Sequence, residues 1–214
     1  MLVEEMTYMV GTRVLLWRLE EEPQQLLALC REQGIPVEDL EELPAKRQRE
    51  KAAERLLLCR TFGRPVTLLH DGQGAPSVQE MDMNVSISHT MKLVALAWDE
   101  EHVIGLDAEL CDRGQVIKVR DKFLNAAEQQ FIQVDDLAAH IIAWTAKEAI
   151  IKSERNSALD WTEGIILEPF SVGAGETCLT AHCGRNCYRL ASRLLEDHYI
   201  TLAMPATGEY NKEA

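Results

Sequence analysis

The chain has 214 residues, 46% of them hydrophobic, which is enough for one large domain or two small ones. Its formal net charge of −13 argues against nucleic acid as a general partner. No apolar run approaches the roughly 20 residues that span a bilayer. The acidic start at Glu4 and Glu5 also lacks the positive charge of a signal peptide. We therefore expect a folded protein of the cytoplasm with no membrane partner.

The first part of the chain alternates between strand and helix patterns. Residues 8–19 are rich in Val, Leu and Trp and predict a strand. A short helix is predicted over 26–30, and apolar residues at helical spacing predict a longer one over 44–62 that ends at Gly63. The turn-forming residues of 71–76 predict a loop.

The rest of the chain continues with strands and helices. A β-meander is predicted from three strands at 84–89, 93–98 and 103–110. Helical patterning returns over 116–123, 126–131 and 136–153. Either Asp135 or Asp136 is positioned to cap the last of these helices. Four more strands are predicted at 164–169, 178–183, 187–194 and 199–205. The order of elements favours an α+β protein of two related halves, although no residue-level repeat proves a duplication.

Two acidic motifs are the most informative feature of the sequence. Asp107 and Glu109 alternate with aliphatic residues, which on a strand places both carboxylates on one face. Glu148 and Lys152 are four residues apart, which on a helix places them on one face. Each pair alone is most often a solvated strand face or a surface ion pair. Three carboxylates and a lysine from two elements together predict a magnesium and phosphate site.

Other clusters have simpler interpretations. Cys178, Cys183, Cys187 and His182 do not have the paired spacing of a zinc site, so we expect ordinary thiols. The sequence also contains two basic clusters, and each can be explained as a solvated helix face. The first comprises Lys46, Arg47, Arg49, Lys51, Arg55, Arg60 and Arg64. The second comprises Arg113, Lys118, Arg120 and Lys122.

An ordered set of motifs resembles a known family. Its parts are Ser86-Ile-Ser-His89, Ile104-Gly-Leu-Asp-Ala-Glu109 and Trp144-Thr-Ala-Lys-Glu-Ala-Ile-Ile-Lys152, with Phe123-Leu-Asn-Ala-Ala-Glu128 between the last two. In this order they resemble the phosphopantetheinyl transferase superfamily, most closely its larger monomeric branch, typified by the surfactin-synthetase activating enzyme. The resemblance covers roughly residues 44–170.

The resemblance implies an activity and an architecture. Enzymes of this family transfer the phosphopantetheine arm of coenzyme A to a serine of a carrier protein and release adenosine 3′,5′-bisphosphate. The implied fold has two similar α/β halves around a pseudo-twofold axis, with the active site in the cleft between them. On this view 1–105 is the half with basic residues that bind coenzyme A, and 106–214 is the half with the acidic metal site and the surface for the carrier. A complete cleft in each chain implies a monomer.

The resemblance also assigns roles to residues. It implies Asp107, Glu109 and Glu148 as ligands of Mg²⁺, with Mn²⁺ as the alternative. Glu148 either completes the metal shell or takes the proton of the attacking serine, and Lys152 binds the pyrophosphate. Ser88 and His89 are implied at the 3′-phosphate of coenzyme A, the substrate. Lys46 and Arg49 are implied near the adenosine phosphates, although Arg47 or Arg55 would serve as well, and Lys147 is a further candidate.

The sequence departs from the family pattern at three places. Gly74-Ala75-Pro76 replaces a Gly-Lys-Pro, so one lysine near the nucleotide is missing. Ala108 replaces a branched aliphatic residue, and 153–159 replaces a glycine-rich continuation. None of these changes removes a proposed metal ligand.

The expected partner is an acyl or peptidyl carrier protein. Such carriers are acidic, so we expect them to dock on the second basic cluster, Arg113, Lys118, Arg120 and Lys122. Two other functions remain open from sequence. One is a Mg²⁺-dependent hydrolase of pyrophosphates that uses the same acids, and the other is a non-catalytic module that binds coenzyme A or the carrier.

Overall fold

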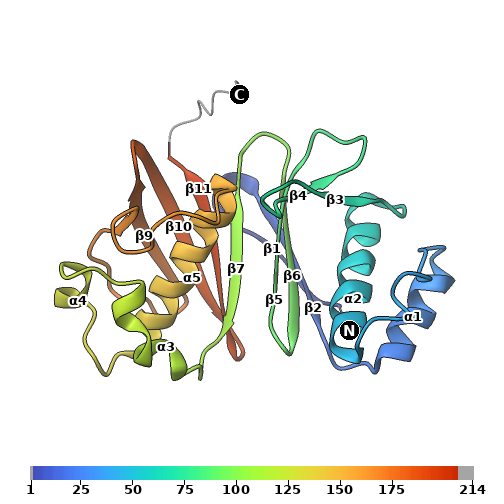
Figure 1. Cartoon of the computed structure of the whole chain (residues 1–214), viewed down its shortest axis with the longest axis horizontal. Coiled ribbons are helices and arrows are strands. Elements are labelled where there is room, and N and C mark those ends of the chain that lie inside the picture. The colour runs from blue at the N-terminus through green and yellow to red at the C-terminus, as the bar shows by residue number, and fades with distance from the viewer. Residues whose placement is uncertain (1, 207–214) are drawn as a thin grey trace.

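The computed structural model describes residues 2–206 and shows a mixed α/β protein (Figure 1). Its first part contains β1 (Leu2–Thr7), η1 (Met9–Gly11), β2 (Arg13–Arg18), α1 (Pro23–Glu32), α2 (Ala45–Phe62), β3 (Leu68–His70), β4 (Pro76–Val78), β5 (Asn84–His89) and β6 (Leu93–Asp99). Its second part contains β7 (Gly105–Leu110), α3 (Gln115–Lys118), η2 (Arg120–Lys122), α4 (Glu128–Phe131), α5 (Leu137–Glu154), β8 (Ile165–Leu167), β9 (Glu176–Cys183), β10 (Asn186–Leu195) and β11 (His198–Pro205).

Two antiparallel sheets form the centre of the molecule, and helices cover their outer faces (Figure 1). The first sheet has the order β1-β2-β6-β5, and the second has the order β7-β11-β10-β9-β8. Between them lies an apolar layer that includes Val14 and Leu16 of β2 and Ile200 and Leu202 of β11. Because successive residues of a strand face opposite sides, the alternate residues of these strands face the helices.

The first sheet is covered by α1 and α2. Leu15 and Trp17 of β2 pack in the same cluster as Leu56 and Leu57 of α2, on the face away from the central layer. The predicted helix over 44–62 is confirmed as α2, and Gly63 ends it in the left-handed conformation, with φ of 68°. That conformation is the one a glycine adopts without a Cβ penalty.

The second sheet is covered by α5, which is buried on most sides. Ile142, Ala146 and Ile150 are fully buried between the sheet and the loops around α3 and α4. The predicted cap is confirmed at Asp136, whose side chain accepts a hydrogen bond of 2.9 Å from the Ala139 N–H. A helix that is apolar nearly all round belongs inside a fold, and α5 is the core element of this half.

The predicted three-stranded meander is wrong in its third strand. β5 and β6 pair as expected, but β7 leaves this sheet and pairs with β11 of the other one. β5 contacts β7 through side chains and not through a backbone ladder. Ser86 and Ser88 of β5 accept hydrogen bonds from the backbone N–H groups of Leu106 and Ala108. A meander requires consecutive strands to pair, and here the apolar face of β7 is buried in the layer between the sheets instead.

The predicted strand over 8–19 is also shorter than expected. The 3-10 turn Met9–Gly11 interrupts it, and the strand β2 starts only at Arg13. Gly11 has φ of 91°, which breaks an extended run. The other predicted helices and strands lie within a few residues of those observed, with the helix expected over 116–123 divided into α3 and η2.

Contacts at the strand ends join the two sheets. Lys92 forms an ion pair of 2.8 Å with Asp197, and the Thr90 hydroxyl lies 2.9 Å from His198 Nε2. Within residues 2–206, no helix is both long enough and apolar enough to cross a membrane. The expectation of a mixed fold is confirmed, whereas a twofold relation between the halves stays a prediction.

Candidate active site

The candidate site lies where α5 crosses β7. Gly105 touches α5 so closely that an added Cβ would overlap the carbonyl oxygen of Ala149. Asp107 and Glu109 lie on the same face of β7 as Gly105, because side chains alternate along a strand. Leu106 and Ala108 face the central apolar layer. The two acidic residues thus face the helix that carries Glu148 and Lys152.

Asp107 is held by two neighbours and is 7% exposed. The Ser88 hydroxyl donates to Asp107 Oδ1 at 2.8 Å, and Lys152 Nζ lies at the same distance from the same oxygen. Lys152 also donates to the Leu106 carbonyl at 2.8 Å, so its ammonium group is fixed by two acceptors. These contacts bring together three of the residues that the sequence singled out.

Glu109 is paired with a residue that was assigned to carrier docking. Its carboxylate contacts the Arg113 guanidinium and accepts a hydrogen bond of 2.9 Å from the Leu110 N–H. The Arg113 guanidinium also lies 5.4 Å from the centroid of the Trp144 ring. Arg113 therefore belongs to the acidic site at least as much as to the surface.

Glu148 differs from the other two carboxylates. In residues 2–206 its carboxylate has no hydrogen bond or ion pair, although the side chain is half-buried. Burial raises the pKa of Glu148, and the negative charge of Asp107 raises it further, while Lys152 and Arg113 oppose the rise. A half-buried carboxylate beside a second carboxylate is suited to receive a proton or a cation.

The three carboxylates have the right chemistry for a hard cation but are not arranged as a closed metal site. Among the described residues, no group of three His, Cys, Asp or Glu side chains has the geometry to hold a metal ion. Lys152 and Arg113 supply positive charge to Asp107 and Glu109 instead. Carboxylate oxygens are the ligands that Mg²⁺ prefers, and the unpaired Glu148 leaves room for such a charge.

His89 lies at a neighbouring pocket of about 220 Å³. Its Nε2 is 3.5 Å from Glu50 Oε2 on α2. Burial lowers the pKa of His89, Arg47 and Lys152 lower it further, and Glu50 raises it. Arg47 lines the same pocket and donates to Glu50 Oε2 at 2.9 Å.

The predicted basic residues of α2 separate in space. Lys46 is exposed at 3.7 Å from Glu50 Oε1, whereas the Arg49 guanidinium contacts the Leu19 carbonyl. Arg55 forms hydrogen bonds with Asp39 and with the Pro36 carbonyl. The geometry thus favours Arg47, beside His89, as the residue of α2 that binds a phosphate. The assignment of Arg49 to the phosphates stays a prediction, and the position of Arg49 does not support it.

A second pocket of about 180 Å³ is lined by Lys152 and shares lining residues with the His89 pocket. Both pockets are lined by Gly74, Pro76 and Ile87. The second is also lined by Lys152 and Arg155 from the other half of the chain. The loop 71–76, which was predicted as a loop, therefore lies at the junction of both halves.

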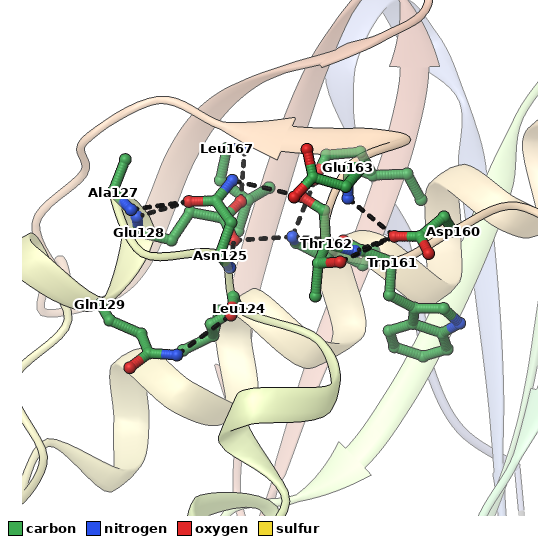
Figure 2. Close-up of polar contacts among 12 residues, drawn as sticks. Leu124, Asn125, Ala127, Glu128, Gln129, Asp160, Trp161, Thr162, Glu163 and Leu167 are labelled. Carbon is green, nitrogen blue, oxygen red and sulfur yellow. Dashed lines mark hydrogen bonds and ion pairs between the residues drawn. The ribbon is translucent and has the colours of Figure 1, made fainter.

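Lys147, a further candidate for the phosphates, lies away from the site. It is 0% exposed and donates to Glu128 Oε2 and to the carbonyls of Trp161 and Ile165. Burial lowers the pKa of Lys147, and Glu128 opposes the shift. Figure 2 shows Glu128 within a polar network that links Asn125 to Thr162. Lys147 is thus a structural residue of this network.

Sequence reasoning missed Glu50 and Ser86. Glu50 is only 4% exposed although it lies on a helix rich in charge. Its position three and seven residues before Ala53 and Leu57 could have signalled it, since this spacing places it on the buried face of α2. Ser86 accepts a hydrogen bond of 2.8 Å from the Leu106 N–H and helps to join the halves. The alternation of 84–89 could have signalled Ser86, since it places Ser86 and Ser88 on one face.

A comparison with known families finds a match over the part of the chain that contains the acidic site. Residues 103–203 match the family model described as the 4′-phosphopantetheinyl transferase superfamily. The matched stretch contains Asp107, Glu109, Glu148 and Lys152, and is therefore similar to a domain of that superfamily. No curated protein matches the chain. The larger monomeric branch stays a prediction.

Proposed function

We propose that this chain transfers the phosphopantetheine arm of coenzyme A to a serine of an acyl or peptidyl carrier protein. The other product is adenosine 3′,5′-bisphosphate. The observation that carries the proposal is the convergence of Asp107, Glu148 and Lys152 at the crossing of β7 and α5, inside the matched stretch. A pocket lined by His89 and Arg47 adjoins this crossing.

In the proposed reaction the serine hydroxyl attacks the phosphorus atom that bears the pantetheine arm. The new bond joins the serine oxygen to phosphorus, and the bond between phosphorus and the bridging oxygen of the pyrophosphate breaks. The bridging oxygen leaves with the adenosine bisphosphate. Glu148 is suited to take the serine proton, directly or through water, because it has no other partner among residues 2–206 and its pKa is raised by burial.

Lys152 and Ser88 prepare the site for this chemistry. The Lys152 ammonium group is fixed by Asp107 and the Leu106 carbonyl, so it presents its remaining donor to an oxygen of the pyrophosphate. Ser88 holds Asp107 Oδ1 from the side of β5. A positively charged group placed in advance near the leaving oxygens stabilises the charge that develops there. The predicted contact of Ser88 with a phosphate gives way in this proposal to a positioning role.

A divalent cation is part of the proposal. Asp107, Glu109 and Glu148 would hold Mg²⁺, or Mn²⁺ in its place, once Lys152 and Arg113 give up part of their contacts. When bound, the ion neutralises phosphate oxygens and favours attack by an alcohol. If Glu148 is a ligand, water takes the serine proton instead.

The proposed enzyme is a monomer of the cytoplasm, in which one chain supplies the residues of both pockets. Its carrier would dock at exposed Lys118 and Lys122. In this proposal 1–105 supplies the nucleotide pocket and 106–214 supplies the acidic site.

Intact-mass spectrometry tests the proposal. An apo acyl carrier protein is incubated with the protein, coenzyme A and Mg²⁺, beside samples with EDTA and with Glu148→Gln. We expect a gain of one phosphopantetheine only in the wild-type sample with metal. Cleavage of coenzyme A without modification of the carrier would instead indicate a hydrolase. Intact coenzyme A and unmodified carriers of several types would indicate a binding module.

A further inference from the structure

Arg155 occupies a backbone position that usually belongs to glycine. It directly follows α5 and has φ of 51°, in the left-handed region. The N–H groups of Arg155 and Asn156 donate to the carbonyls of Lys152 and Ile151, both at 3.3 Å. These two hydrogen bonds form a Schellman motif, whose left-handed residue is most often glycine because a Cβ is unfavourable there. An arginine here costs stability, and the backbone does not require it.

The Arg155 guanidinium group carries an unpaired charge. It has no hydrogen bond or ion pair in residues 2–206, and the residue is exposed. It is not needed to cap α5, because backbone N–H groups already satisfy the last carbonyls. Backbone N–H groups of Ala75 and Gln73 hold the pKa of Asp71 below its ordinary value, and Arg155 lowers that pKa further. In the same residues, however, Asp71 forms no ion pair with Arg155, and its Oδ1 accepts the N–H groups of Gln73 and Ala75.

Arg155 and Lys152 line the same pocket of about 180 Å³. Among the described residues that line it, none is Asp or Glu. The others contribute amide, hydroxyl and apolar groups, including Gln73, Ser157 and Ile87. Apolar walls exclude water and strengthen the attraction of a cation for an anion. Lys152 is balanced by Asp107 at 2.8 Å, so the charge of Arg155 is in excess in this pocket.

The pocket is formed by both halves of the chain and is small. The Ser157 hydroxyl, in the loop after α5, donates to Gln73 Oε1 in the loop 71–76 at 3.3 Å. Asp107 and the Leu106 carbonyl fix Lys152 Nζ and leave its third donor for a ligand. Pockets that enclose a whole small molecule have roughly 300–1,000 Å³. This pocket therefore suits a small anionic group.

We propose that Arg155 and Lys152 together bind the oxygens of a diphosphate group in this pocket. A diphosphate carries more than one negative charge, which matches two cations, and its oxygens accept from both a guanidinium and an ammonium group. The proposal goes beyond the proposed function, which gives Arg155 no role, and it rests on the pocket and its charges. An arginine stands where glycine is more stable because its charge holds the ligand.

Calorimetry with inorganic pyrophosphate tests this site on the metal-free protein in EDTA. We expect the wild-type protein to bind pyrophosphate and Arg155→Gly to bind it about ten-fold or more weakly, the usual effect of losing a hydrogen bond to a charged group. Arg155→Lys keeps the charge and should lose less affinity than Arg155→Gly. Absence of binding by the wild-type protein, or equal affinities in wild type and Arg155→Gly, would overturn the proposal.

Urea unfolding of the same variants separates binding from folding. Arg155→Gly should unfold at the same urea concentration as wild type or at a higher one, since glycine adopts the left-handed conformation without a Cβ penalty. Its weaker binding then does not come from a damaged fold. Unfolding of Arg155→Gly at a lower urea concentration would show that the arginine serves the fold, and would overturn the proposal.

Two further glycine variants are the controls. Arg185→Gly removes an exposed charge in the turn between β9 and β10. Glu80→Gly changes another exposed residue of positive φ, at 61°. Both should keep the wild-type affinity for pyrophosphate. A loss in Arg185→Gly as large as that in Arg155→Gly would reduce the effect to overall charge and overturn the proposal.

Coenzyme A as a second probe separates this site from the proposed function. A parallel loss of its affinity in Arg155→Gly would identify its diphosphate as the bound group, and a loss for pyrophosphate alone would identify a free diphosphate. Binding of pyrophosphate at Arg155 without modification of any carrier protein would refute the proposed function alone. Transfer to a carrier with unchanged pyrophosphate binding in Arg155→Gly would refute the role of Arg155 alone.

Discussion

Lys152 of α5 and Asp107 of β7 form an ion pair of 2.8 Å at the crossing of the two elements. The same oxygen of Asp107 accepts the Ser88 hydroxyl from β5 at 2.8 Å. Three elements from distant parts of the sequence therefore meet at one carboxylate oxygen. This arrangement makes the position of Lys152 depend on both halves of the chain.

The first prediction concerns Lys152. We expect Lys152→Ala to lower kcat for carrier modification on the order of 10²-fold, because a preorganised cation near the leaving oxygens is lost. The KM for coenzyme A should change less. Steady-state kinetics on a carrier protein measures both, and Arg185→Ala, an exposed basic residue in the turn between β9 and β10, is the control. An unaltered kcat would exclude Lys152 from the reaction.

A second prediction concerns the pH dependence of stability in the metal-free protein. Folding raises the pKa of Glu148 above its ordinary value of 4.5, so the folded chain holds a proton that the unfolded chain releases. The contribution of Glu148 to the free energy of unfolding is fully present below its ordinary pKa. This contribution is lost as the pH rises through the raised pKa of the folded chain. Glu148→Gln removes this titration. The variant should therefore gain stability relative to wild type as pH rises.

Urea unfolding at several pH values with EDTA measures this difference. Glu32→Gln, an exposed glutamate of α1, is the control and should follow wild type throughout. Parallel curves for wild type and Glu148→Gln would show that folding does not perturb Glu148. Adding Mg²⁺ should raise the Tm of wild type more than that of Glu148→Gln, because a ligand that binds only the folded chain stabilises it.

A third prediction concerns Gly105. In Gly105→Ala the new methyl group would overlap the Ala149 carbonyl, so α5 or β7 has to shift. We expect a loss of about 1–3 kcal/mol or more in the free energy of unfolding, as for other overpacked sites. Activity should fall as well, since the shift separates Lys152 from Asp107. Gly114→Ala is the matched control because nothing lies within 4 Å of its added Cβ, and stability equal to this control would contradict the close approach.

A fourth prediction concerns the buried pair Lys147 and Glu128. Both side chains are at most 1% exposed and are joined by an ion pair of 2.8 Å. Lys147→Met leaves the Glu128 charge buried without its partner and should cost about 3–5 kcal/mol. Adding Glu128→Gln should restore part of this loss, because the remaining charge is removed. Denaturant unfolding of both single variants and the double variant measures the coupling, and simple additivity would disprove it.

The last prediction concerns docking of the carrier protein. Lys118 and Lys122 are exposed, whereas Arg120 is half-buried and its Nε has no hydrogen-bond partner in the described part of the chain. Reversing Lys118 and Lys122 to Glu should raise the KM for an acidic carrier more than the KM for coenzyme A. Arg185→Glu, in the turn between β9 and β10, is the charge control. Equal effects on both substrates would remove the docking role.

Local patterns by themselves determined the two long helices and most of the strands of this protein, but not β1, β3 or β4. The spacing of apolar residues along α2 and α5 predicted both long helices, and the capping Asp136 was placed within one residue. The alternation around Asp107 and Glu109 predicted a shared face for the two carboxylates. These features depend on periods of 2.0 and 3.6 residues, which a sequence displays directly.

Tertiary structure alone decided how these elements are joined. β7 pairs with β11 rather than β6 because its aliphatic face is buried between two sheets, and strand pairing over such distances leaves no local signal. Tertiary structure also decided which partner each charged side chain has. Lys147 next to Glu148 is buried with Glu128, and Glu50 rather than Arg49 lines the His89 pocket. A charged residue in a sequence shows what it can bind, but only packing decides which partner lies within reach.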